Sequence, residues 1–436
     1  MKNLNKKKIS KSTLYNWAKD LFPINRSLTG PGNLETLNYF KKIIPDLKIK
    51  KIKSRTKINS WKVPDEWIIK DGYIKNNKNK KILDFNKSNL HILGFSTKVN
   101  KILNYKELSK NLYYLKKQPN VIPYVTSYYK KKWGFCISYN KFKKINKNQK
   151  YHVFIDSKFK KGSLIYGELL IKGKSKREIL ISTNICHPSL GNNELSGPIV
   201  STGLAKYLSS KKNYFSYRIL FLPETIGSIA YIDKYKKKLK KNVVAGFVAV
   251  CVGDNKSWSV LNSPSKDLLC DNLAKYILDK NKIKYTKFNF DDHRGSDERQ
   301  YCWPGVDLPI CSVMRSKYGT YKEYHTSADN LDFISADGLW GSFTIYKKMF
   351  SFLEKNNDFY ENNLYGKSEP FLTKYNLINS TSIKADYKKT NLIMKLIYLT
   401  TKKKNIIDLS TLTNNKIKYV RKVLKLLIKK KIIRKS

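Results

Sequence analysis

The side chains in this sequence that are best suited to chemistry are two histidines and a glutamate far apart along the chain. His187 follows Cys186 in the stretch CHPSLGNNELSG, Glu224 lies in FLPETIGS, and His325 lies in YHTSADN. Two imidazoles with carboxylates from separate loops suit zinc, which accepts nitrogen and oxygen ligands and keeps an open position when it is catalytic. A nearby glutamate that is not a ligand could then deprotonate the water on the metal.

These residues are expected where the strands of one sheet end. The apolar run EILIST (178–183) comes shortly before His187, and the run LPICSVM (308–314) precedes His325. Ligand sites of α/β sheets gather at this edge. Five carboxylates follow predicted strands or lie in turn-rich loops: Glu194, Glu224, Asp254, Asp297 and Glu298.

Each of these signals alone also fits a structural role. A single histidine after a strand is more often a satisfied structural residue than a ligand. Glu224 before TIGS could simply be a helix N-terminal charge favoured by the helix dipole. His91 and His152 lie in alternating, β-like runs and are predicted to be structural, whereas His293 lies in a charged loop and is predicted to be solvated. The joint pattern favours the metal site.

The elements that must position these residues form an α/β fold. From 165 to 355, predicted strands alternate with helices, which is typical of a sheet with helices on both faces. Between 50 and 165, short alternating runs with turn residues predict an inserted small β domain. Two C-terminal helices joined by NIIDLSTLTNN resemble a winged-helix module. We therefore expect a main domain from 1–55 and 166–360, an inserted domain at 56–165 and a winged-helix domain at 361–436.

Composition narrows the class of protein. The 436 residues include 87 lysines and arginines against 33 acidic residues, a formal charge of +54. Such a charge suits binding to nucleic acid or to an anionic membrane surface. Lysine is, however, frequent along the whole chain, which indicates a general compositional bias and not a focused binding patch. The six cysteines form no CxxC pair, and several lie in apolar runs where a reduced, buried thiol is expected. The sequence has no apolar signal core and no run near the roughly 18 to 20 residues of a membrane span, so we expect a soluble cytoplasmic protein.

Several long blocks, in order, resemble a known bacterial family. They are LFPINRSLTGPGN, WKVPDEWIIKDGYI, NLHILGFS, IPYVTSYYKKKWGFC, STNICHPSLGNNELSGP, LPETIGSIAYI, DERQYCWPGVDLPICSVMRS and EYHTSADN. That family combines a zinc-aminopeptidase-like domain with an inserted small β domain and a C-terminal winged helix. The resemblance covers nearly the whole chain, and the family is often found near surface-polysaccharide biosynthesis.

The resemblance also implies roles for particular residues. Within the wider aminopeptidase superfamily, His187 matches the first metal histidine and His325 the last, while Glu224 matches the catalytic base. The chain departs from the two-metal pattern at the second glutamate, which is Thr225, and at the bridging aspartate, which is Asn193.

The departures leave the site short of carboxylates. The aspartate that the superfamily has after the next strand falls in AVCVG, where only Asp254 is close. Neutral ligands compensate less of a divalent cation's charge, which makes a second nearby metal costly. The resemblance therefore implies one zinc ion held by the two histidines with Glu194 or Asn193, and a site without metal remains the alternative.

Two functions follow. The first is a metal-dependent hydrolase of an amide or peptide-like bond that acts on small peptides or amino sugars. Arg299 and Arg315 are candidates to hold a carboxylate or phosphate of the substrate. Both arginines could equally be surface charges. The second is a catalytically altered, ligand-binding or nucleic-acid-binding regulator that uses the lysine-rich helix in NNKIKYVRKVLKLLIKKK. Because apolar residues cover so much of that helix, packing or homo-oligomer formation is favoured over nucleic-acid binding.

Overall fold

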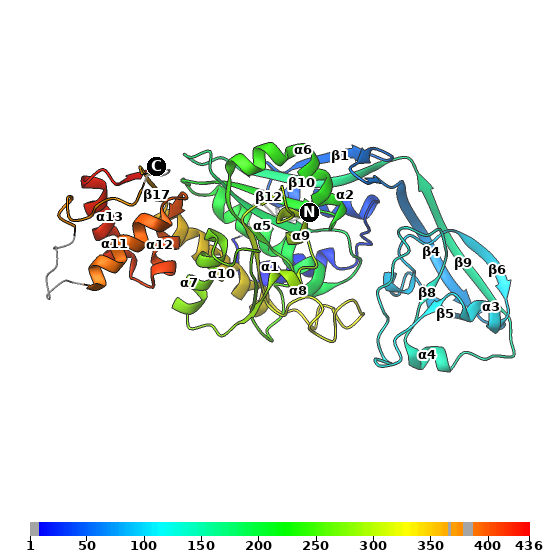
Figure 1. Ribbon diagram of the computed structural model, residues 1–436. Coiled ribbons are helices and arrows are strands. Elements are labelled where there is room, and N and C mark those ends of the chain that lie inside the picture. The colour runs from blue at the N-terminus through cyan, green and yellow to red at the C-terminus, as the bar shows by residue number, and fades with distance from the viewer. Residues whose placement is uncertain (1–7, 365–367, 378–386) are drawn as a thin grey trace.

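The computed structural model describes residues 8–364, 368–377 and 387–436 of the chain. A central α/β body carries a β-rich lobe on one side and a helical lobe on the other (Figure 1). Within the described ranges, no helix is both long and apolar enough to cross a membrane.

The body is built on an eight-stranded mixed sheet. In spatial order its strands are β1 (Lys48–Lys53), β10 (Ser163–Ile171), β12 (Ser216–Leu222), β11 (Glu178–Asn184), β13 (Val243–Val248), β16 (Ile310–Met314), β14 (Ser259–Leu261) and β15 (Thr286–Phe288). The four strands β12, β11, β13 and β16 run parallel, and β1 and β10 join antiparallel to their neighbours. At the other edge β14 is antiparallel to β16 and parallel to β15. Every residue of β11 and β12 is buried, as expected for strands covered on both faces. Parallel strands end at a common edge, so the loops after them can meet.

Helices cover both faces of this sheet. They are α1 (Lys11–Leu21), α2 (Pro31–Ile43), α5 (Ser196–Ser209), α6 (Ile226–Asn242), α7 (Leu269–Lys280), α8 (Phe290–His293), α9 (Glu298–Tyr301) and α10 (Ala336–Lys355). Alternate side chains of β11 enter different cores, because Ile179 and Ile181 pack with α1, α5, α7 and α10 while Leu180 packs with α6 and α9. The predicted sheet with helices on both faces, matching an aminopeptidase-like fold, is confirmed.

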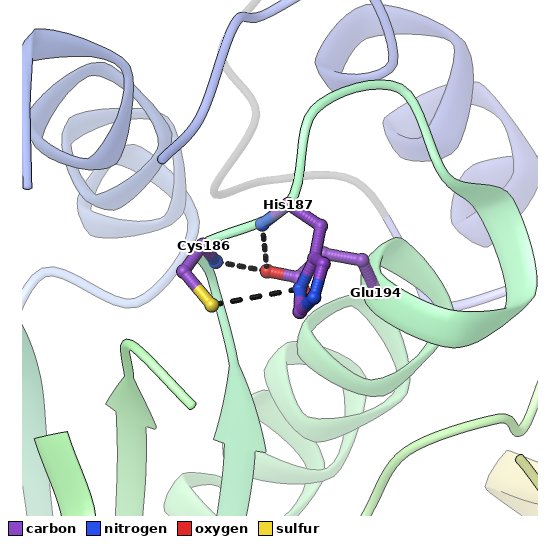
Figure 2. Close-up of side chains that lie close together, drawn as sticks. All are labelled: Cys186, His187 and Glu194. Carbon is purple, nitrogen blue, oxygen red and sulfur yellow. Dashed lines mark hydrogen bonds and ion pairs between the residues drawn. The ribbon is translucent and has the colours of Figure 1, made fainter. Parts of the chain in front are cut away.

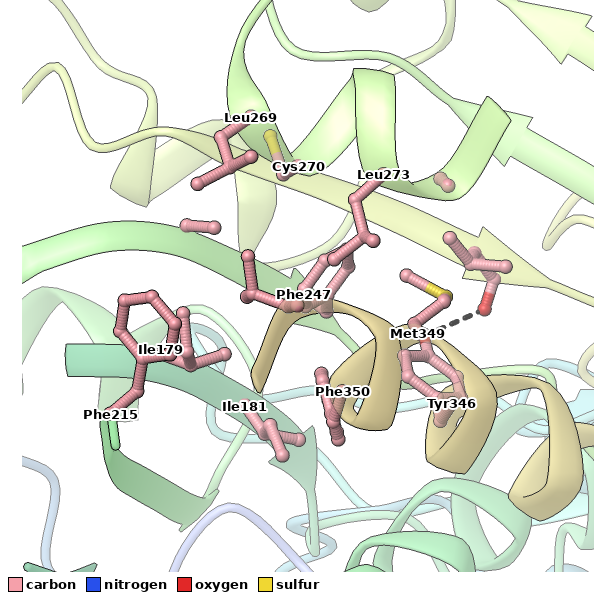
Figure 3. Packing of buried hydrophobic residues seen from close by; sticks show 14 of the residues in the cluster. Ile179, Ile181, Phe215, Phe247, Leu269, Cys270, Leu273, Tyr346, Met349 and Phe350 are labelled. Atoms are coloured by element: carbon pink, nitrogen blue, oxygen red, sulfur yellow. Dashed lines mark hydrogen bonds between the residues drawn. The ribbon is translucent and has the colours of Figure 1, made fainter. Parts of the chain in front are cut away.

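The larger core lies between the sheet and α10. In Figure 3, Ile179 and Ile181 of β11 and Phe247 of β13 lie opposite the apolar face of α10. The Phe247 ring lies 5.9 Å from the Tyr346 ring and 5.8 Å from the Phe350 ring, centroid to centroid. Aromatic contacts of this kind add stability beyond the area that they bury. This packing holds α10 against the strands β11 and β13.

The β-rich lobe is a separate small sheet. Its antiparallel strands, in spatial order, are β5 (Lys81–Asp84), β4 (Glu66–Lys75), β9 (Tyr151–Lys160) and β6 (Val99–Leu103). It also holds the short elements η2 (Asn89–His91), α3 (Tyr105–Ser109), β7 (Leu112–Tyr113), β8 (Phe135–Cys136) and α4 (Tyr139–Lys143), and the hairpin of β2 (Lys57–Ile58) and β3 (Trp61–Lys62) lies beside β4 in the sequence. The lobe has a hydrophobic core of its own. It occupies the sequence range in which the inserted domain was expected, although the domain boundaries themselves stay a prediction.

The helical lobe follows the body. Its elements are β17 (Phe359–Asn362), α11 (Tyr387–Leu399), β18 (Lys404–Asn405), α12 (Ile406–Thr413), α13 (Ile417–Lys429) and β19 (Ile433–Lys435). The apolar face of α13, with Val420 and Leu424 buried, belongs to the same core as the main sheet. The amide of Asn272 on α7 also donates to Asp408 on α12, at 2.8 Å. The apolar side of α13 is therefore used for packing. A winged-helix role for this lobe stays a prediction.

Candidate active site

The loop that carries His187 is pressed against the carboxyl edge of the sheet. It leaves β11 after Asn184 and re-enters helical structure through η3 (Gly191–Leu195), a single π-helical turn that continues into α5. Gly197 makes this approach feasible, because a Cβ atom at that position would collide with the carbonyl oxygen of Ala249 after β13. Single π-helical turns such as η3 are frequent at functional sites.

His187 is held from one side by Glu194. The Nδ1 atom of His187 lies 2.6 Å from one carboxylate oxygen of Glu194, and the other oxygen accepts the backbone N–H groups of His187 (2.9 Å) and Cys186 (Figure 2). A carboxylate on one ring nitrogen fixes the orientation and tautomer of a histidine and leaves Nε2 available as a ligand. Both oxygens of Glu194 are thus used by its own loop, which suits an orienting role better than the ligand role predicted from the sequence.

A substitution of Glu194 should therefore weaken metal binding without abolishing it. We expect Glu194→Gln to lower zinc affinity by about 10- to 100-fold, the range typical of a lost orienting partner. Competition with a chromophoric chelator measures this affinity. The exposed glutamate Glu35 on α2 offers a matched control, and an unchanged affinity in Glu194→Gln would argue against the orienting role.

Cys186 stands beside this pair as a thiol. Cys186, His187 and Glu194 offer ligand atoms within 4.8 Å of one another, the spacing of a metal site. Burial, however, raises the pKa of the Cys186 thiol to about 12, and its sulfur accepts the N–H of Glu224 at 3.2 Å. The sulfur of Cys186 and both oxygens of Glu194 thus make hydrogen bonds within the protein, and the open side of His187 is the side of Nε2.

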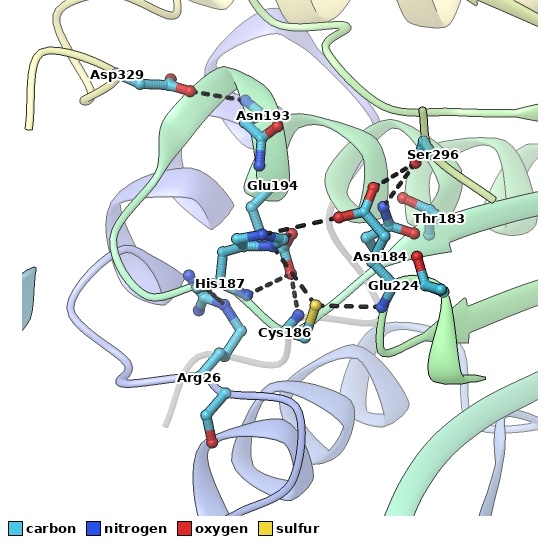
Figure 4. Close-up of polar contacts among 12 residues, drawn as sticks. Arg26, Thr183, Asn184, Cys186, His187, Asn193, Glu194, Glu224, Ser296 and Asp329 are labelled. Carbon is cyan, nitrogen blue, oxygen red and sulfur yellow. Dashed lines mark hydrogen bonds and ion pairs between the residues drawn. The ribbon is translucent and has the colours of Figure 1, made fainter. Parts of the chain in front are cut away.

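Glu224 faces that open side. It follows β12, and its Oε2 atom lies 3.8 Å from Nε2 of His187 (Figure 4). Its other oxygen accepts a hydrogen bond from Ser296 at 2.5 Å, and Asn184 at the end of β11 donates to the Ser296 hydroxyl at 3.2 Å. Burial raises the pKa of the Glu224 carboxyl, and the charge of His187 and the Ser296 hydrogen bond only partly offset this. A raised pKa is characteristic of a general base.

His325 completes the group from the loop after β16. Its ring centroid lies 5.3 Å from that of His187, and its backbone has φ 54°, a left-handed conformation that a non-glycine residue seldom adopts. Tyr124 of the β-rich lobe lies edge-on to both rings, at 5.0 Å and 5.2 Å, and donates its N–H to the His325 carbonyl at 2.8 Å. Below, the set of His187, Glu224 and His325 is called the catalytic group.

The two histidines differ in protonation. Burial and the charge of His187 lower the pKa of His325 to about 3, so its ring is neutral at neutral pH. Its Nε2 atom is buried and has no hydrogen-bond partner among the residues that the structure describes. Burial lowers the pKa of His187, but the charge of the adjacent Glu194 carboxylate opposes this, and the pKa is raised above its ordinary value. A buried nitrogen without a partner is costly, and a zinc ion shared with His187 would satisfy it.

Other carboxylates near the site are already committed. Asp254 accepts from Asn192, from the backbone of Lys256, and from both the N–H and the hydroxyl of Ser316. Asp329 accepts the backbone N–H of Asn192 and that of Asn193, the latter at 3.0 Å. Asn193 itself is buried on η3, beside Glu194. These contacts leave few oxygens for a second metal.

A strained backbone lies directly after Glu224. Thr225 has φ 63° and ψ −65°, and a β-branched residue adopts this region only under constraint. Its N–H donates to the buried carboxylate of Asp297 at 2.7 Å, and the Ser228 hydroxyl donates to the same oxygen at 2.9 Å. Asp297 therefore fixes the turn that aims Glu224 into the site.

Asp297 should make the stability of the metal-free protein depend on pH. Burial and the Glu224 charge raise its pKa from 3.8 to about 8. The folded state thus holds a proton that the unfolded chain releases, so the contribution is complete below pH 3.8 and is lost as pH rises toward about 8. We expect Asp297→Asn, which keeps the accepting oxygen and cannot titrate, to flatten the fall in Tm across this range. Exposed Asp307 serves as a control by Asp307→Asn, and identical slopes in all three proteins would contradict the assignment.

The two arginines predicted to bind substrate lie elsewhere. Arg315 is buried, donates to the Asp254 carbonyl at 2.6 Å and stacks over the Trp258 ring at 4.4 Å, so its charge is used within the fold. Arg299 lies on α9 and lines a cavity of about 930 Å³ whose lining includes none of the catalytic group. The structure thus brings together His187, Glu194, Glu224 and His325, with Asn193 next to them, and leaves both arginines outside.

Sequence reasoning missed several residues of the site. Ser296 directly precedes the acidic pair in GSDERQYC, so the turn that drew attention to Asp297 could also have indicated it. Asn184 ends a predicted strand and is a similar case. Tyr124 had no signal in the sequence, because its role depends on contact between the β-rich lobe and the loop of His325.

The mixed sheet, its covering helices and the cluster at its carboxyl edge define an aminopeptidase-like α/β protein. A family model described as a domain of unknown function, DUF4910, matches residues 15–356. A Clostridium acetobutylicum protein named "Putative polysaccharide biosynthesis protein with aminopeptidase-like domain" is 42% identical over 374 residues, 86% of this chain and 85% of that protein. The chain belongs to this family of aminopeptidase-like proteins.

Solved structures agree with this placement. The crystal structure of a "putative peptidase" from Clostridium acetobutylicum has a TM-score of 0.80 and 37% identity, covering 98% of this chain and 96% of that one. A zinc aminopeptidase from Bacillus subtilis has a TM-score of 0.58 and 13% identity, covering 80% and 95%. The second likeness concerns the fold alone.

Proposed function

We propose that this protein is a zinc-dependent hydrolase of an amide or peptide-like bond, with one zinc ion held by His187 and His325. The observation that carries the proposal is the buried, unpartnered Nε2 of His325 beside an oriented His187. Peptidase-like relatives support a hydrolase of the peptidase type. Asn193 is the remaining side chain from the predicted ligand set that could supply an oxygen, while Glu194 orients His187.

The residues around the metal divide the work of hydrolysis. Zinc, when bound, supplies a Lewis acid that polarises the substrate carbonyl and lowers the pKa of water. Glu224 accepts the proton of the attacking water and returns it to the leaving nitrogen, since its Oε2 atom faces the site while Ser296 holds Oε1. Tyr124 lies against both imidazoles and keeps bulk water away from them.

The substrate is proposed to be a small peptide-like or amino-sugar compound in the cytoplasm. The family relative is named for polysaccharide biosynthesis and the Bacillus neighbour for zinc aminopeptidase activity, which supports an amide in either setting. All six cysteines are free and buried, as expected in a reducing compartment.

Elemental analysis and a hydrolysis assay on the same preparation test this function. We expect about one zinc per chain, and release of p-nitroaniline from aminoacyl-p-nitroanilides that stops with 1,10-phenanthroline and returns when zinc is restored. The non-chelating 1,7-phenanthroline is the matched control. A preparation that neither retains zinc nor hydrolyses any of these amides would overturn the proposal.

Because the nearby carboxylates are hydrogen-bonded within the fold, one second candidate function is favoured, a catalytically altered regulator. Asp254 and Asp329 are both bonded within the fold, which leaves the site poor in charge. In that case the protein would hold no metal and would bind DNA with a strong dependence on salt concentration. The same elemental analysis separates the two functions.

A further inference from the structure

A second cavity lies in the β-rich lobe. It has a volume of about 600 Å³, within the range of small-molecule sites. Its walls come from the β4–β5 hairpin, η2, α4 and the start of β9. Among the residues that the structure describes, its lining includes neither histidine of the catalytic group. The proposed hydrolase does not use this space.

The lining of the cavity is both cationic and apolar. Five lysines line it, against one acidic residue: Lys80, Lys81, Lys87, Lys141 and Lys144, with Asp84. Asp84 is paired with Lys81 at 3.2 Å, which leaves the other four lysines as an uncompensated positive field. Ile82, Ile137 and Ile145 line the same space. A ligand that carries an anionic group and an apolar face would match both regions.

His91 adds a directional contact. It is 4% exposed and lines the cavity, and its Nδ1 atom lies 2.8 Å from the Cys136 carbonyl oxygen, to which it must donate. Burial lowers the pKa of His91, so the ring is neutral and Nε2 is a hydrogen-bond acceptor. Nε2 of His91 is not one of the buried atoms that lack a partner, so it is accessible at the cavity wall. An accessible acceptor there can take a hydrogen bond from a ligand hydroxyl group.

We propose that this cavity binds a small anionic sugar, with its carboxylate or phosphate on the lysines, a hydroxyl on Nε2 of His91 and an apolar ring face on the isoleucines. Lys141 lies on α4 and Lys144 just after it, whereas Lys80 and Lys87 flank the β5 strand. The anion is held between these two pairs. An uncharged sugar lacks this attraction, and inorganic phosphate lacks the ring and the hydroxyl donor placement.

Isothermal titration calorimetry on the full chain tests this site, with D-glucuronate and D-glucose 6-phosphate as separate probes. We expect saturable binding of at least one of them below about 10 mM, with D-glucose and inorganic phosphate each binding about tenfold more weakly or not at all. The comparison of the two probes shows whether the anion is a carboxylate or a phosphate. Binding should persist in His187→Ala, which places it outside the catalytic group.

A matched pair of double variants separates this site from the general positive charge. Lys141→Glu with Lys144→Glu should weaken binding by about tenfold or more, since two attractive charges become repulsive. Lys143→Glu with Lys147→Glu changes the net charge equally, on exposed lysines of the same segment that do not line the cavity, and should bind like the wild type. Equal loss in both variants, or no saturable binding of either probe, would overturn the proposal.

Discussion

Glu224→Gln should lower the turnover number of the zinc-loaded protein by about 10²- to 10⁴-fold, the range of a lost general base. Glutamine keeps the shape and can still accept the Ser296 hydrogen bond, but it cannot take a proton from water. The measurement is kcat on the best aminoacyl-p-nitroanilide, with zinc content determined on the same sample. Zinc content near the wild-type level is expected, because Glu224 is not one of the proposed ligands.

Ser296→Ala tests the same residue indirectly, because it removes only the hydrogen bond to Glu224. The Ser296 hydrogen bond lowers the pKa of Glu224, so its loss should move the acidic limb of the kcat–pH profile to higher pH. The change in kcat at the optimum should be much smaller than in Glu224→Gln. If Glu224→Gln keeps wild-type activity, Glu224 is not the base; if it loses zinc, Glu224 is a ligand.

His187→Ala and His325→Ala should each abolish zinc retention. With one imidazole removed, few protein ligands remain, since Glu194 is bonded to its own loop and Glu224 to Ser296. Elemental analysis after desalting measures the retained zinc. The exposed His293 provides a matched control, and His293→Ala should retain zinc like the wild type. Retention in both active-site variants would refute the site.

Acid should compete with zinc in the same experiment. The pKa of His187 in the metal-free protein is raised well above its ordinary value, so a proton occupies the imidazole that the metal needs. Zinc affinity should therefore rise with pH up to that pKa and should fall as the solution is acidified. A zinc affinity that is independent of pH would place the metal on other groups.

The sequence was sufficient to predict the sheet and the meeting of three distant residues. Buried apolar runs indicated parallel strands, which end at one edge, and the family resemblance pointed to His187, Glu224 and His325 together. The roles of Glu194 and Arg315 could not be read in this way. Glu194 is bonded to the backbone of its own loop, and Arg315 is bonded to the loop after β13. Such contacts depend on loop conformation, which hydrophobic periodicity does not describe.

The contact between the β-rich lobe and the His325 loop has a consequence for how the protein matures. Ile122 and Ser327, 205 residues apart in sequence, exchange hydrogen bonds at 2.9 Å and 2.8 Å, beside the bond from Tyr124 to His325. Contacts between such distant segments form late, because closing a long loop costs entropy before it is rewarded. A nascent chain therefore contains His187 long before His325 is in place. Zinc uptake is expected to be one of the last steps in its biogenesis, after translation has passed Ser327.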